Sequence, residues 1–460
     1  MPKKPSVLIV GAGAVGLSTA IHLKRAGYES VTVVDEQEYD KNHYSPIRAD
    51  CDAASADLNK IVRSSYGGYK NGAEYQKLAM EAMHVWDEWN RELENSKPGQ
   101  FGPLTANDVL FSRCGYLRLR SKPELGSAEV ASLQNSADLG QRSQQYVLND
   151  QEDERRAAAA GISEKLRPFP PGVAENAVLD LTSGFAYADK ACTFALHLAE
   201  QLGVTFYLGP QHRLLSLLET AQKDGSTHVR GIATPSGQHH ADFTILACGS
   251  WTPSILPKEL AGLLEATAGS VTVIQIDDED LRKKYGPERF VVWTAIEHGG
   301  QTAKDAEVSE FEGLYGFPVT PDGLMKFGFR GTKYTNFADN PEVSTPRTVR
   351  TRIPETRIVA SAFRPVERFI SRYMPDLVGK YRVWGTRLCW YTDSPSNDWL
   401  FDHVPGKEGL LVASGGSGHL FKFLPTVGQH VVAALERRRT PYSHMLSVPL
   451  DRRIKLLNRC

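Results

Sequence analysis

The fold is decided by the stretch Val7-Leu8-Ile9-Val10-Gly11-Ala12-Gly13-Ala14-Val15-Gly16, followed by a helical pattern and a second apolar strand that ends at Asp35. An apolar strand that runs into a Gly-x-Gly-x-x-Gly turn and a helix is typical of a dinucleotide-binding βαβ unit. Asp35 comes 22 positions after Gly13, where an acidic side chain accepts the hydroxyls of an adenosine ribose. The opening of the chain therefore predicts a nucleotide site.

Each residue type in this turn has a physical reason. Gly11 suits the tight turn, Gly13 lets the backbone approach a pyrophosphate, and Gly16 lets the helix pack closely on the strand. The helix starts at about Ala14 and Val15, so its N-terminus, with its partial positive charge, faces the anion. We expect these five residues to hold a cofactor.

Composition narrows the class of protein. The chain has 460 residues, with 53 basic against 54 acidic side chains, which predicts two or three domains and gives no electrostatic case for nucleic acid or an anionic membrane. No apolar run approaches the ~18 residues that span a bilayer, and the first strand begins too early to leave room for a signal peptide. The six cysteines are widely separated, which favours a reducing compartment over a zinc site or disulfides, and we expect no metal. A small-molecule partner fits best.

Regular elements continue after the first unit. The sequence predicts a half-buried strand over 115–120, because polar and apolar residues alternate there, and a solvated helical segment over 124–161. Further predicted elements are helices over 73–93 and 193–202, a hairpin of 213–217 with 229–234, and a buried strand over 243–248. Strands over 271–276, 290–296, 313–318 and 324–329 lack βαβ spacing, which predicts an antiparallel sheet and a substrate domain.

The last quarter of the chain repeats the strand, glycine-rich loop and helix order. A strand over 410–413 leads into a loop with Gly416, Gly418 and His419, and a helix follows over 425–435. We expect this loop to face the cofactor as well. The dipole of this helix would stabilise negative charge on a bound cofactor.

Over nearly the whole chain, the sequence resembles the monomeric sarcosine oxidase and fructosyl amino acid oxidase group of flavoproteins. The resemblance runs from the opening glycines through Asp57-Leu58-Asn59-Lys60-Ile61-Val62-Arg63-Ser64-Ser65-Tyr66-Gly67 and Tyr315-Gly316-Phe317-Pro318 to Gly416-Ser417-Gly418-His419-Leu420-Phe421-Lys422-Phe423. It implies FAD as cofactor, and oxidation of the C–N bond of a secondary amino acid to an imine, with oxygen as acceptor and hydrogen peroxide as product. A monomer is usual in this group.

The resemblance also implies an α/β fold. A glutathione-reductase-like Rossmann domain that binds FAD is interleaved with an antiparallel-sheet substrate domain, as in D-amino acid oxidase. We expect residues 1–95, 181–260 and 371–460 to form the FAD-binding parts, and residues 96–180 and 261–370 to form the substrate parts.

Matching positions carry proposed roles. By resemblance, Cys389 attaches FAD covalently through a thioether, Lys60 lies at the cofactor, and Arg63 grips the substrate carboxylate together with Lys422. A carboxylate in a partly dry site needs paired cations of this kind. The open alternatives are that Cys389 is a small buried residue and that the two cations are solvated surface charges.

Three more residues complete the predicted site. Tyr315 and Tyr391 match tyrosines that line the substrate pocket, although a tyrosine in a strand is usually packing. Lys326 lies in an otherwise apolar strand, an expensive place for an ammonium group. In the family the matching lysine promotes oxygen reduction, since a fixed positive charge stabilises superoxide. The alternative is an edge strand whose lysine points to water.

The chain departs from the family on the substrate side. Fructosyl amino acid oxidases pair an acid, four positions after the oxygen-activating lysine, with an arginine in the last glycine loop. This chain has Arg330 and His419 at those positions. A cation in place of an acid disfavours a sugar and favours another carboxylate. We therefore expect an N-substituted amino acid with an extra acidic or cyclic part, of the kind oxidised by fungal saccharopine or pipecolate oxidases. Arg330 neutralising Asp339 or Glu342 is the alternative.

Other functions stay open at this point. They are a fructosyl amino acid oxidase, a tailoring amine oxidase of secondary metabolism, a flavin dehydrogenase with a non-oxygen acceptor, and a non-catalytic nucleotide-binding protein. We expect a cytoplasmic location, with the peroxisome as alternative, since the final Asn458-Arg459-Cys460 is a poor match to a Ser-Lys-Leu-type address.

Overall fold

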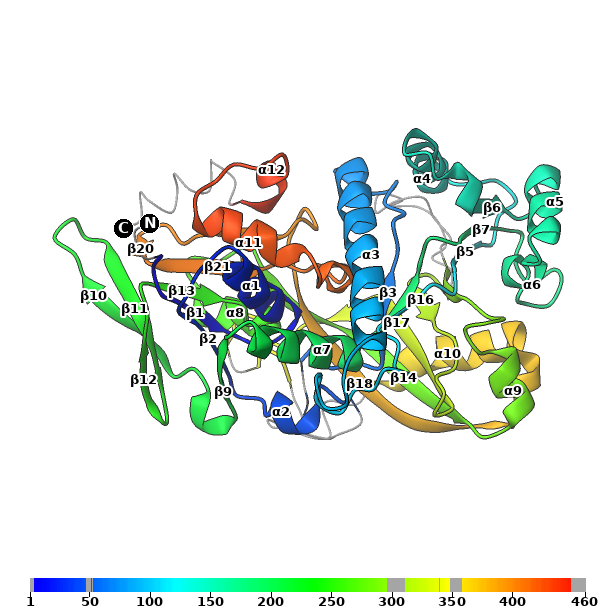
Figure 1. Ribbon diagram of the computed structural model, residues 1–460. Helices are drawn as coiled ribbons and strands as arrows, with labels where there is room; N and C mark the ends of the chain where they lie inside the picture. The colour runs from blue at the N-terminus through cyan, green and yellow to red at the C-terminus, as the bar shows by residue number, and fades with distance from the viewer. Residues whose placement is uncertain are drawn as a thin grey trace.

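The computed structural model describes residues 4–46, 51, 53–295, 311–338, 340–347 and 358–447. The C-terminal tripeptide considered above as a targeting signal lies outside these residues. Two large sheets dominate the fold, and in the view of Figure 1 the long helix α3 (Gly72–Glu94) stands between them. The predicted helix over 73–93 is therefore confirmed.

The first large sheet contains the opening βαβ unit. Its strand order is β19-β21-β13-β1-β2-β9, and β1 pairs in parallel with both β2 and β13. Only β19 runs antiparallel to its neighbour. The strands are β1 (Val7–Val10), β2 (Val31–Asp35), β9 (Thr205–Leu208), β13 (Phe243–Leu246), β19 (Leu400–His403) and β21 (Leu410–Ser414).

The side chains of β1 point alternately to the two faces of this sheet, and both faces are buried. Val7 and Ile9 join the cluster that includes α1 (Ala14–Arg25), α7 (Ala188–Gln201) and α11 (Val427–Leu435). Leu8 and Val10 instead join the cluster that includes Val229 and Ile232, because successive side chains of a strand point to opposite faces. That second layer is the sheet of β10 (Ser216–Ala221), β11 (Thr227–Thr234), β12 (Gly237–His240) and β20 (Lys407–Glu408).

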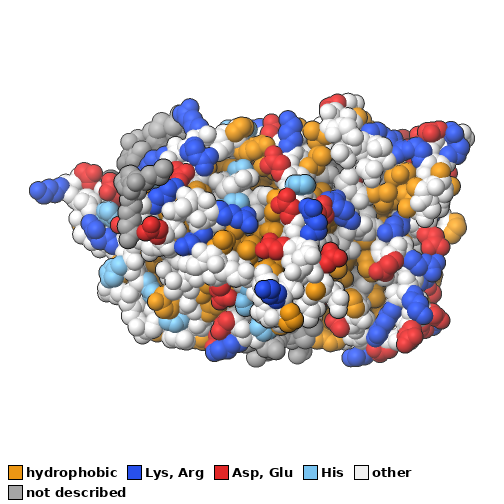
Figure 2. Space-filling model, in the orientation of Figure 1, with side chains coloured by type: hydrophobic (Ala, Val, Ile, Leu, Met, Phe, Trp, Pro, Cys, Tyr) orange, Lys and Arg blue, Asp and Glu red, His pale blue; other side chains and the backbone are white. Residues whose placement is uncertain are grey.

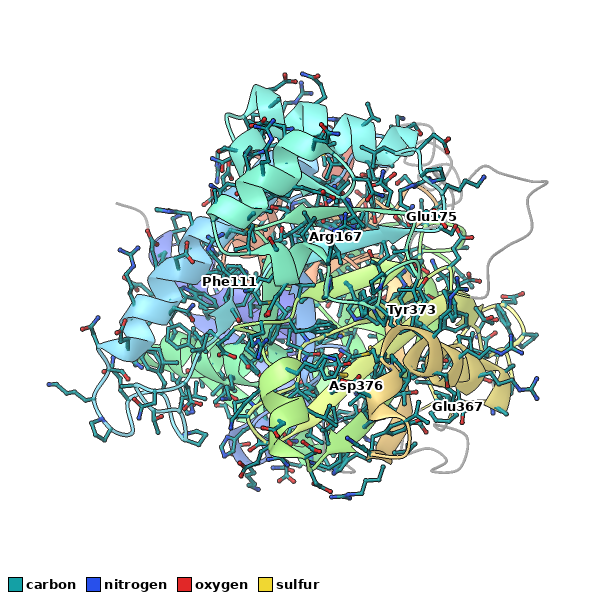
Figure 3. All side chains as sticks on the ribbon, turned by 90° about the vertical axis from the view of Figure 1, so that its right-hand side faces the viewer. Phe111, Arg167, Glu175, Glu367, Tyr373 and Asp376 are labelled. Carbon is teal, nitrogen blue, oxygen red and sulfur yellow. The ribbon has the colours of Figure 1, made fainter. Side chains whose placement is uncertain are left out.

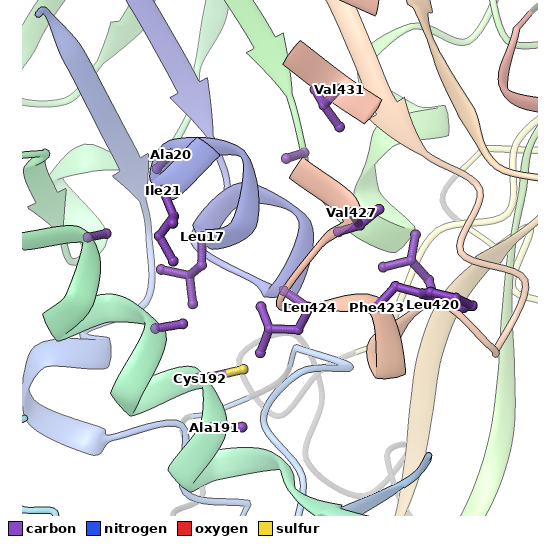
Figure 4. Packing of buried hydrophobic residues seen from close by; sticks show 14 of the residues in the cluster. Leu17, Ala20, Ile21, Ala191, Cys192, Leu420, Phe423, Leu424, Val427 and Val431 are labelled. Atoms are coloured by element: carbon purple, nitrogen blue, oxygen red, sulfur yellow. The ribbon is translucent and has the colours of Figure 1, made fainter. Parts of the chain in front are cut away.

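Helix α11 packs closely on α1, as Figure 4 shows. A Cβ on Gly428 would lie 2.1 Å from the Ser18 carbonyl oxygen, so only glycine permits this approach. Just before α11, Phe423 and Leu424 are buried in the same cluster. The sequence predicted that this helix begins at Pro425. It begins instead at Val427, with Thr426 as its N-cap residue, so Pro425 lies outside the helix. This packing fixes the short turn that carries Lys422.

The second large sheet has eight strands in the order β18-β14-β17-β16-β15-β5-β7-β6. It is antiparallel as predicted, except that β15 pairs in parallel with β5. The strands are β5 (Tyr116–Arg120), β6 (Gln145–Val147), β7 (Asn176–Asp180), β14 (Glu265–Ile276), β15 (Val292–Ala295), β16 (Leu314–Gly316), β17 (Leu324–Tyr334) and β18 (Tyr381–Asp393).

Helix α10 (Ala360–Tyr373) covers the outer face of this sheet. Phe369 of α10 stacks on Trp293 of β15, with ring centroids 3.9 Å apart. Figure 3 shows this end of the molecule, with Tyr373 of α10 and Asp376 just beyond it labelled. The remaining strands, β3 (Asn59–Val62), β4 (Phe111–Ser112) and β8 (Gly184–Tyr187), form a small antiparallel sheet.

Three local predictions are wrong. All five residues of β5 are buried rather than half of them, because β15 and β7 pair with its two edges and hydrophobic clusters cover both of its faces. The segment 124–161 holds α4 (Ser127–Asp138) and α5 (Gln151–Ala159), but β6 between them extends the sheet. Helix α7 begins at Ala188, five positions before the predicted start.

The surface carries mixed charge. On the face shown in Figure 2, basic and acidic side chains are interspersed. No helix within the described ranges has both the length and the apolar composition needed to cross a membrane.

Candidate functional site

A cavity of about 1030 Å³ extends from the opening glycine turn to the closing glycine loop. Every predicted site residue except Gly16 lines it. They are Gly11, Gly13, Ala14, Val15, Asp35, Lys60, Arg63, Tyr315, Lys326, Arg330, Cys389, Tyr391, Gly416, Gly418, His419 and Lys422. The chain therefore brings together residues that lie up to about four hundred positions apart in the sequence.

The nucleotide end of the cavity is built on the glycine turn. Gly11 has φ +107°, and a Cβ there would lie 2.5 Å from the Ala247 carbonyl oxygen. A Cβ on Gly16 would lie 1.8 Å from the Gly11 carbonyl oxygen, which explains why Gly16 packs behind the cavity instead of lining it. The Asp35 carboxylate accepts the Ala12 N–H at 2.7 Å and thereby fixes the turn.

The opposite wall is one face of the eight-stranded sheet. Tyr315 of β16 lies opposite Thr294 of β15 and Gly328 of β17, so their side-chain positions share a face. A Cβ on Gly328 would lie 2.0 Å from the Tyr315 ring, so this glycine makes room for the tyrosine. By the same alternation, Lys326 and Arg330 project to the cavity side, whereas Met325 and Phe327 join the core under α10.

Lys326 is buried in this wall with 1% of its surface exposed. Strand β17 pairs with both β14 and β16, so the edge-strand alternative is wrong. The ammonium donates to Asp57 Oδ2 at 2.7 Å and to the Asn59 carbonyl at 2.6 Å. Burial lowers the pKa of Lys326 to about 8, although Asp57 opposes this shift.

Cys389 of β18 is buried, with the Lys60 ammonium 3.8 Å from its sulfur. Lys60 also donates to Asp57 Oδ2 at 2.6 Å. Burial disfavours the charge of Lys60, but the attraction of Asp57 prevails and raises the pKa. The cysteine therefore faces a fixed positive charge.

Arg63 and Lys422 flank one aromatic ring at the far end of the cavity. The Arg63 guanidinium carbon lies 4.5 Å, and the Lys422 ammonium 5.2 Å, from the centre of the Tyr66 ring. Lys422 donates to the Tyr66 hydroxyl at 2.9 Å and to the His419 carbonyl at 2.6 Å. Burial lowers the pKa of Lys422 well below its usual range, and the neighbouring charge of Arg63 adds to the effect.

His419 completes this network as a neutral ring. Its Nε2 lies 2.8 Å from the Asn397 carbonyl and must donate to it, so Nδ1 accepts the Tyr66 hydroxyl at 3.1 Å. Burial lowers the pKa of His419 well below its usual value, which agrees with this assignment. The structure thus engages both ring nitrogens with the protein.

Arg330 lies against the ring of Tyr391, with its guanidinium carbon 4.7 Å from the ring centre. Its acidic neighbour is Asp393, at 3.9 Å, and not Glu342, one of the two acids of the alternative interpretation; Asp339 lies outside the described residues. Arg330 Nε and Asp393 Oδ1 are buried, and neither has a hydrogen-bond partner within the part of the chain that the structure describes. Gly418, at φ +69°, leaves space for this side chain, since a Cβ there would lie 2.1 Å from Arg330 Nη1.

Sequence reasoning missed four residues of the site. Asp57 and Tyr66 were quoted only as parts of a motif, and no pattern singled out Arg118 or Arg387. Arg118 of β5 is buried, with its guanidinium carbon 6.0 Å from the centre of the Tyr116 ring, and within the described ranges none of its guanidinium nitrogens has a hydrogen-bond partner. A charged residue at alternate positions of a strand usually indicates a solvated face, so burial there was not readable from the sequence.

Comparison of the sequence with known proteins identifies the family of this chain. A family model described as FAD dependent oxidoreductase matches residues 6–434. L-saccharopine oxidase of Schizosaccharomyces pombe is 27% identical over 450 residues, which cover 93% of this chain and 88% of that protein. N-methyl-L-tryptophan oxidase of Escherichia coli O1:K1 is 24% identical over 432 residues, or 93% of each chain.

Solved structures agree. Fructosyl amine:oxygen oxidoreductase (Amadoriase I) of Aspergillus fumigatus superposes with a TM-score of 0.70 at 25% identity, covering 99% of this chain and 92% of that one. A thermally stable mutant of fructosyl peptide oxidase has a TM-score of 0.73 at 21% identity, over 97% and 94% of the two chains, and shows the fold alone. The chain therefore belongs to the family of FAD-dependent oxidoreductases.

Proposed function

We propose that this protein oxidises the C–N bond of a secondary amino acid that carries a further acidic group, and that it reduces oxygen to hydrogen peroxide. The observation that carries the proposal is the placement of Arg63 and Lys422 around Tyr66, in the same cavity as Lys326 and Cys389. The names of the relatives support the class of reaction, since they include oxidases of saccharopine, N-methyltryptophan and fructosyl amines.

The cavity fits FAD together with a small substrate. Its volume of about 1030 Å³ stands at the upper end of ligand pockets. At Gly11 and Gly16 a Cβ would collide with backbone, so the turn keeps the compact shape that suits a pyrophosphate. When bound, FAD supplies the acceptor for the two electrons of the C–N bond.

Cys389 is the proposed attachment point for the cofactor. A thiol becomes a nucleophile as the thiolate, and a nearby ammonium stabilises that form. Lys60 provides this charge 3.8 Å from the sulfur. In our proposal Lys60 therefore assists the attachment, and the thioether keeps the cofactor in the cavity.

Arg63 and Lys422 are the proposed clamp for the substrate carboxylate. Both side chains are held in place by the protein before substrate arrives, Arg63 by the Ser65 carbonyl and Lys422 by Tyr66 and the His419 carbonyl. Such preorganised donors reduce the ordering that binding requires. The clamp orients the carbon next to the amine nitrogen.

Arg330 is the proposed site for the second acidic group. Arg330 Nε, which has no hydrogen-bond partner among the described residues, is the kind of buried group that a ligand satisfies. Asp393 offsets part of the Arg330 charge, but Lys333 also pairs with Asp393 at 2.7 Å. This wall therefore keeps an excess of positive charge, which favours a carboxylate over a neutral polyol.

Lys326 is the proposed oxygen-activating group. Its ammonium lines the cavity, and a fixed cation stabilises the superoxide that forms when oxygen takes the first electron. Only the protonated lysine has this effect, so its charge state matters for the oxidase activity.

Release of hydrogen peroxide, measured over sarcosine, pipecolate, saccharopine and fructosyl-valine, tests the proposal. We expect saccharopine, the one compound of the four that carries a further acidic group, to be oxidised best. Preference for sarcosine or pipecolate would keep the class of reaction but reject the second acidic group. Activity confined to fructosyl-valine would instead support the second candidate, a fructosyl amine oxidase, which the similarity to Amadoriase I favours. The monomeric state and the cytoplasmic location stay predictions.

A further inference from the structure

A single buried carboxylate gathers three cations behind the cavity wall. Asp57 accepts hydrogen bonds from Lys326 at 2.7 Å and from Lys60 at 2.6 Å, both at Oδ2, and its Oδ1 lies 3.5 Å from Arg387 Nη2. Asp57 is 1% exposed. Lys60 and Lys326 line the main cavity, whereas Asp57 does not.

The cluster joins three separate parts of the chain. Asp57 and Lys60 lie just before and within β3, Lys326 comes from β17, and Arg387 comes from β18. Lys326 also donates to the Asn59 carbonyl at 2.6 Å, and Arg387 donates to the Ala56 carbonyl at 2.7 Å. Asp57 thus fixes both the direction of the Lys326 side chain and the distance between β3 and the sheet.

The charge balance of the cluster depends on this one acid. The groups that face Lys326 are Asp57 and Lys60 from the β3 segment, Cys389 from β18, and the ring of Phe317 after β16, at 4.8 Å. Burial opposes the ionisation of Asp57, but Lys326, Lys60 and Arg387 hold the pKa of its carboxyl well below the usual range. Without that negative charge, the Lys326 ammonium would be buried beside another cation.

We propose that Asp57 is a positioning residue for the oxygen step, which keeps Lys326 protonated and directed into the cavity without itself touching substrate or cofactor. This inference rests on the proposed role of Lys326 as the oxygen-activating group. It assigns to Asp57 a function separate from holding the fold and separate from substrate binding.

The rate of reoxidation should depend on pH. Reoxidation needs the charged lysine, so its rate is high below the Lys326 pKa and falls as the pH rises through about 8. Replacing Asp57 by asparagine removes the attraction that supports the charge, so the fall should move to lower pH. Reduction by substrate uses other groups and should keep its pH profile.

The test separates the two half-reactions of the holoenzyme. Wild type, Asp57→Asn and Lys326→Met are reduced by substrate without oxygen in a stopped-flow instrument, then mixed with oxygenated buffer between about pH 6 and about pH 9. For Asp57→Asn we expect reduction within about threefold of wild type and reoxidation at least about tenfold slower at high pH, with partial recovery at low pH. Lys326→Met should be slow at every pH, and the double variant no slower than Lys326→Met.

Matched variants distinguish position from mere stability. Asp57→Glu keeps the charge and should restore most of the wild-type pH profile. Asp153→Asn removes another buried acid that pairs with two arginines, far from the cavity lining, and should leave the reoxidation profile unchanged. A crystal structure of Asp57→Asn should show Lys326 Nζ displaced from the Asn59 carbonyl.

The outcomes separate this inference from the proposed function. If Lys326→Met reoxidises at the wild-type rate, the oxygen role of Lys326 fails, and the role of Asp57 fails with it. If Lys326→Met is slow but Asp57→Asn keeps the wild-type profile, only the inference about Asp57 is overturned. If Asp57→Asn does not fold, Asp57→Glu carries the test. A reoxidation profile that is kept where Lys326 Nζ stays at the Asn59 carbonyl, and lost where Lys326 is displaced, supports the inference. An unchanged profile with a displaced Lys326 overturns it.

Discussion

The ammonium of Lys422 donates a hydrogen bond to the hydroxyl of Tyr66 across 2.9 Å, although the two residues lie 356 positions apart. The same hydroxyl donates to His419 Nδ1, because Nε2 of that ring is committed to the Asn397 carbonyl. Lys422, Tyr66 and His419 thus form a directed chain of donors. Lys422, the first donor of this chain, lies near Arg63. We propose that the substrate carboxylate binds between these two side chains.

Tyr66→Phe should weaken substrate binding more than turnover. The variant removes the hydroxyl that orients Lys422 and leaves His419 without its donor. Loss of a hydrogen bond to a charged group costs about 1.5–3 kcal/mol, so KM should rise by roughly tenfold or more, with kcat less affected. Steady-state peroxide release measures both constants.

Tyr75→Phe provides the control. Its ring stacks on Tyr66 with centroids 5.3 Å apart, and its hydroxyl donates to Asp398 at 3.0 Å, away from Lys422. An equal increase in KM for both variants would show that the loss of any hydroxyl from this aromatic cluster, and not the Lys422 contact in particular, weakens binding.

Binding of the substrate carboxylate should take up a proton. Burial and the charge of Arg63 lower the pKa of Lys422 well below its usual range in the free protein, and an arriving carboxylate raises that pKa again. Affinity should therefore fall as the pH rises. Calorimetric titration with a carboxylate inhibitor, in buffers of different ionisation enthalpy, gives the proton count.

Lys422→Met should abolish this proton uptake while leaving weak binding through Arg63. Binding by the wild type without any proton uptake would show that Lys422 is already charged in the free protein. In that case the clamp would be fully ionised before the substrate arrives.

The proposed covalent link between Cys389 and the flavin predicts a specific chemical behaviour. Wild-type protein should stay yellow after acid precipitation, and Cys389→Ser should release its flavin to the supernatant. Lys60→Met should slow attachment, because the variant removes the positive charge that lies 3.8 Å from the sulfur.

Cys248 supplies the comparison for this experiment. It also lines the cavity, but burial raises the pKa of its thiol, which disfavours the thiolate. Cys248→Ser should therefore keep the flavin attached. Covalent flavin that persists in Cys389→Ser would reject the assignment.

Arg330→Leu should change substrate preference more than overall activity. The variant removes the cation proposed for the second acidic group, so kcat/KM should fall by roughly ten- to a hundredfold for a substrate with an extra carboxylate. A substrate without that group should be nearly unaffected. The ratio of the two values is the measurement.

Gly418→Ala tests the role of Arg330 by crowding its guanidinium group. The new methyl group would lie 2.1 Å from Arg330 Nη1, at a residue with φ +69°. We expect a similar loss of preference, together with about 1 kcal/mol of destabilisation from the backbone conformation. Unchanged preference in both variants would remove Arg330 from the substrate site.

Local patterns were readable from the sequence, and long-range assembly was not. The strand, glycine turn, helix and Asp35 of the opening unit follow one another within thirty-five residues, so their spacing alone predicted the fold of that part. The burial of β5 depends on β15 and β7 as neighbours, and no pattern within residues 116–120 records them.

In the candidate site, too, the sequence indicated individual residues but not the contacts between them. Family resemblance proposed Lys326, Cys389 and Lys422, and the structure places all three on one cavity. It did not indicate that Asp57 joins Lys60 to Lys326, or that Tyr66 joins Lys422 to His419. Those contacts depend on how β3 meets β17 and on how the turn before α11 meets the loop after β3, and these arrangements arise only in the folded chain.

The central claim is that substrate electrons reach oxygen through a flavin held in this cavity. The most direct test is to add substrate to the yellow protein without oxygen, record the loss of visible absorbance, and then admit air. We predict that the colour bleaches, that it returns within seconds to minutes, and that one hydrogen peroxide forms per flavin. Bleaching that air does not reverse, or recovery without peroxide, would contradict the account.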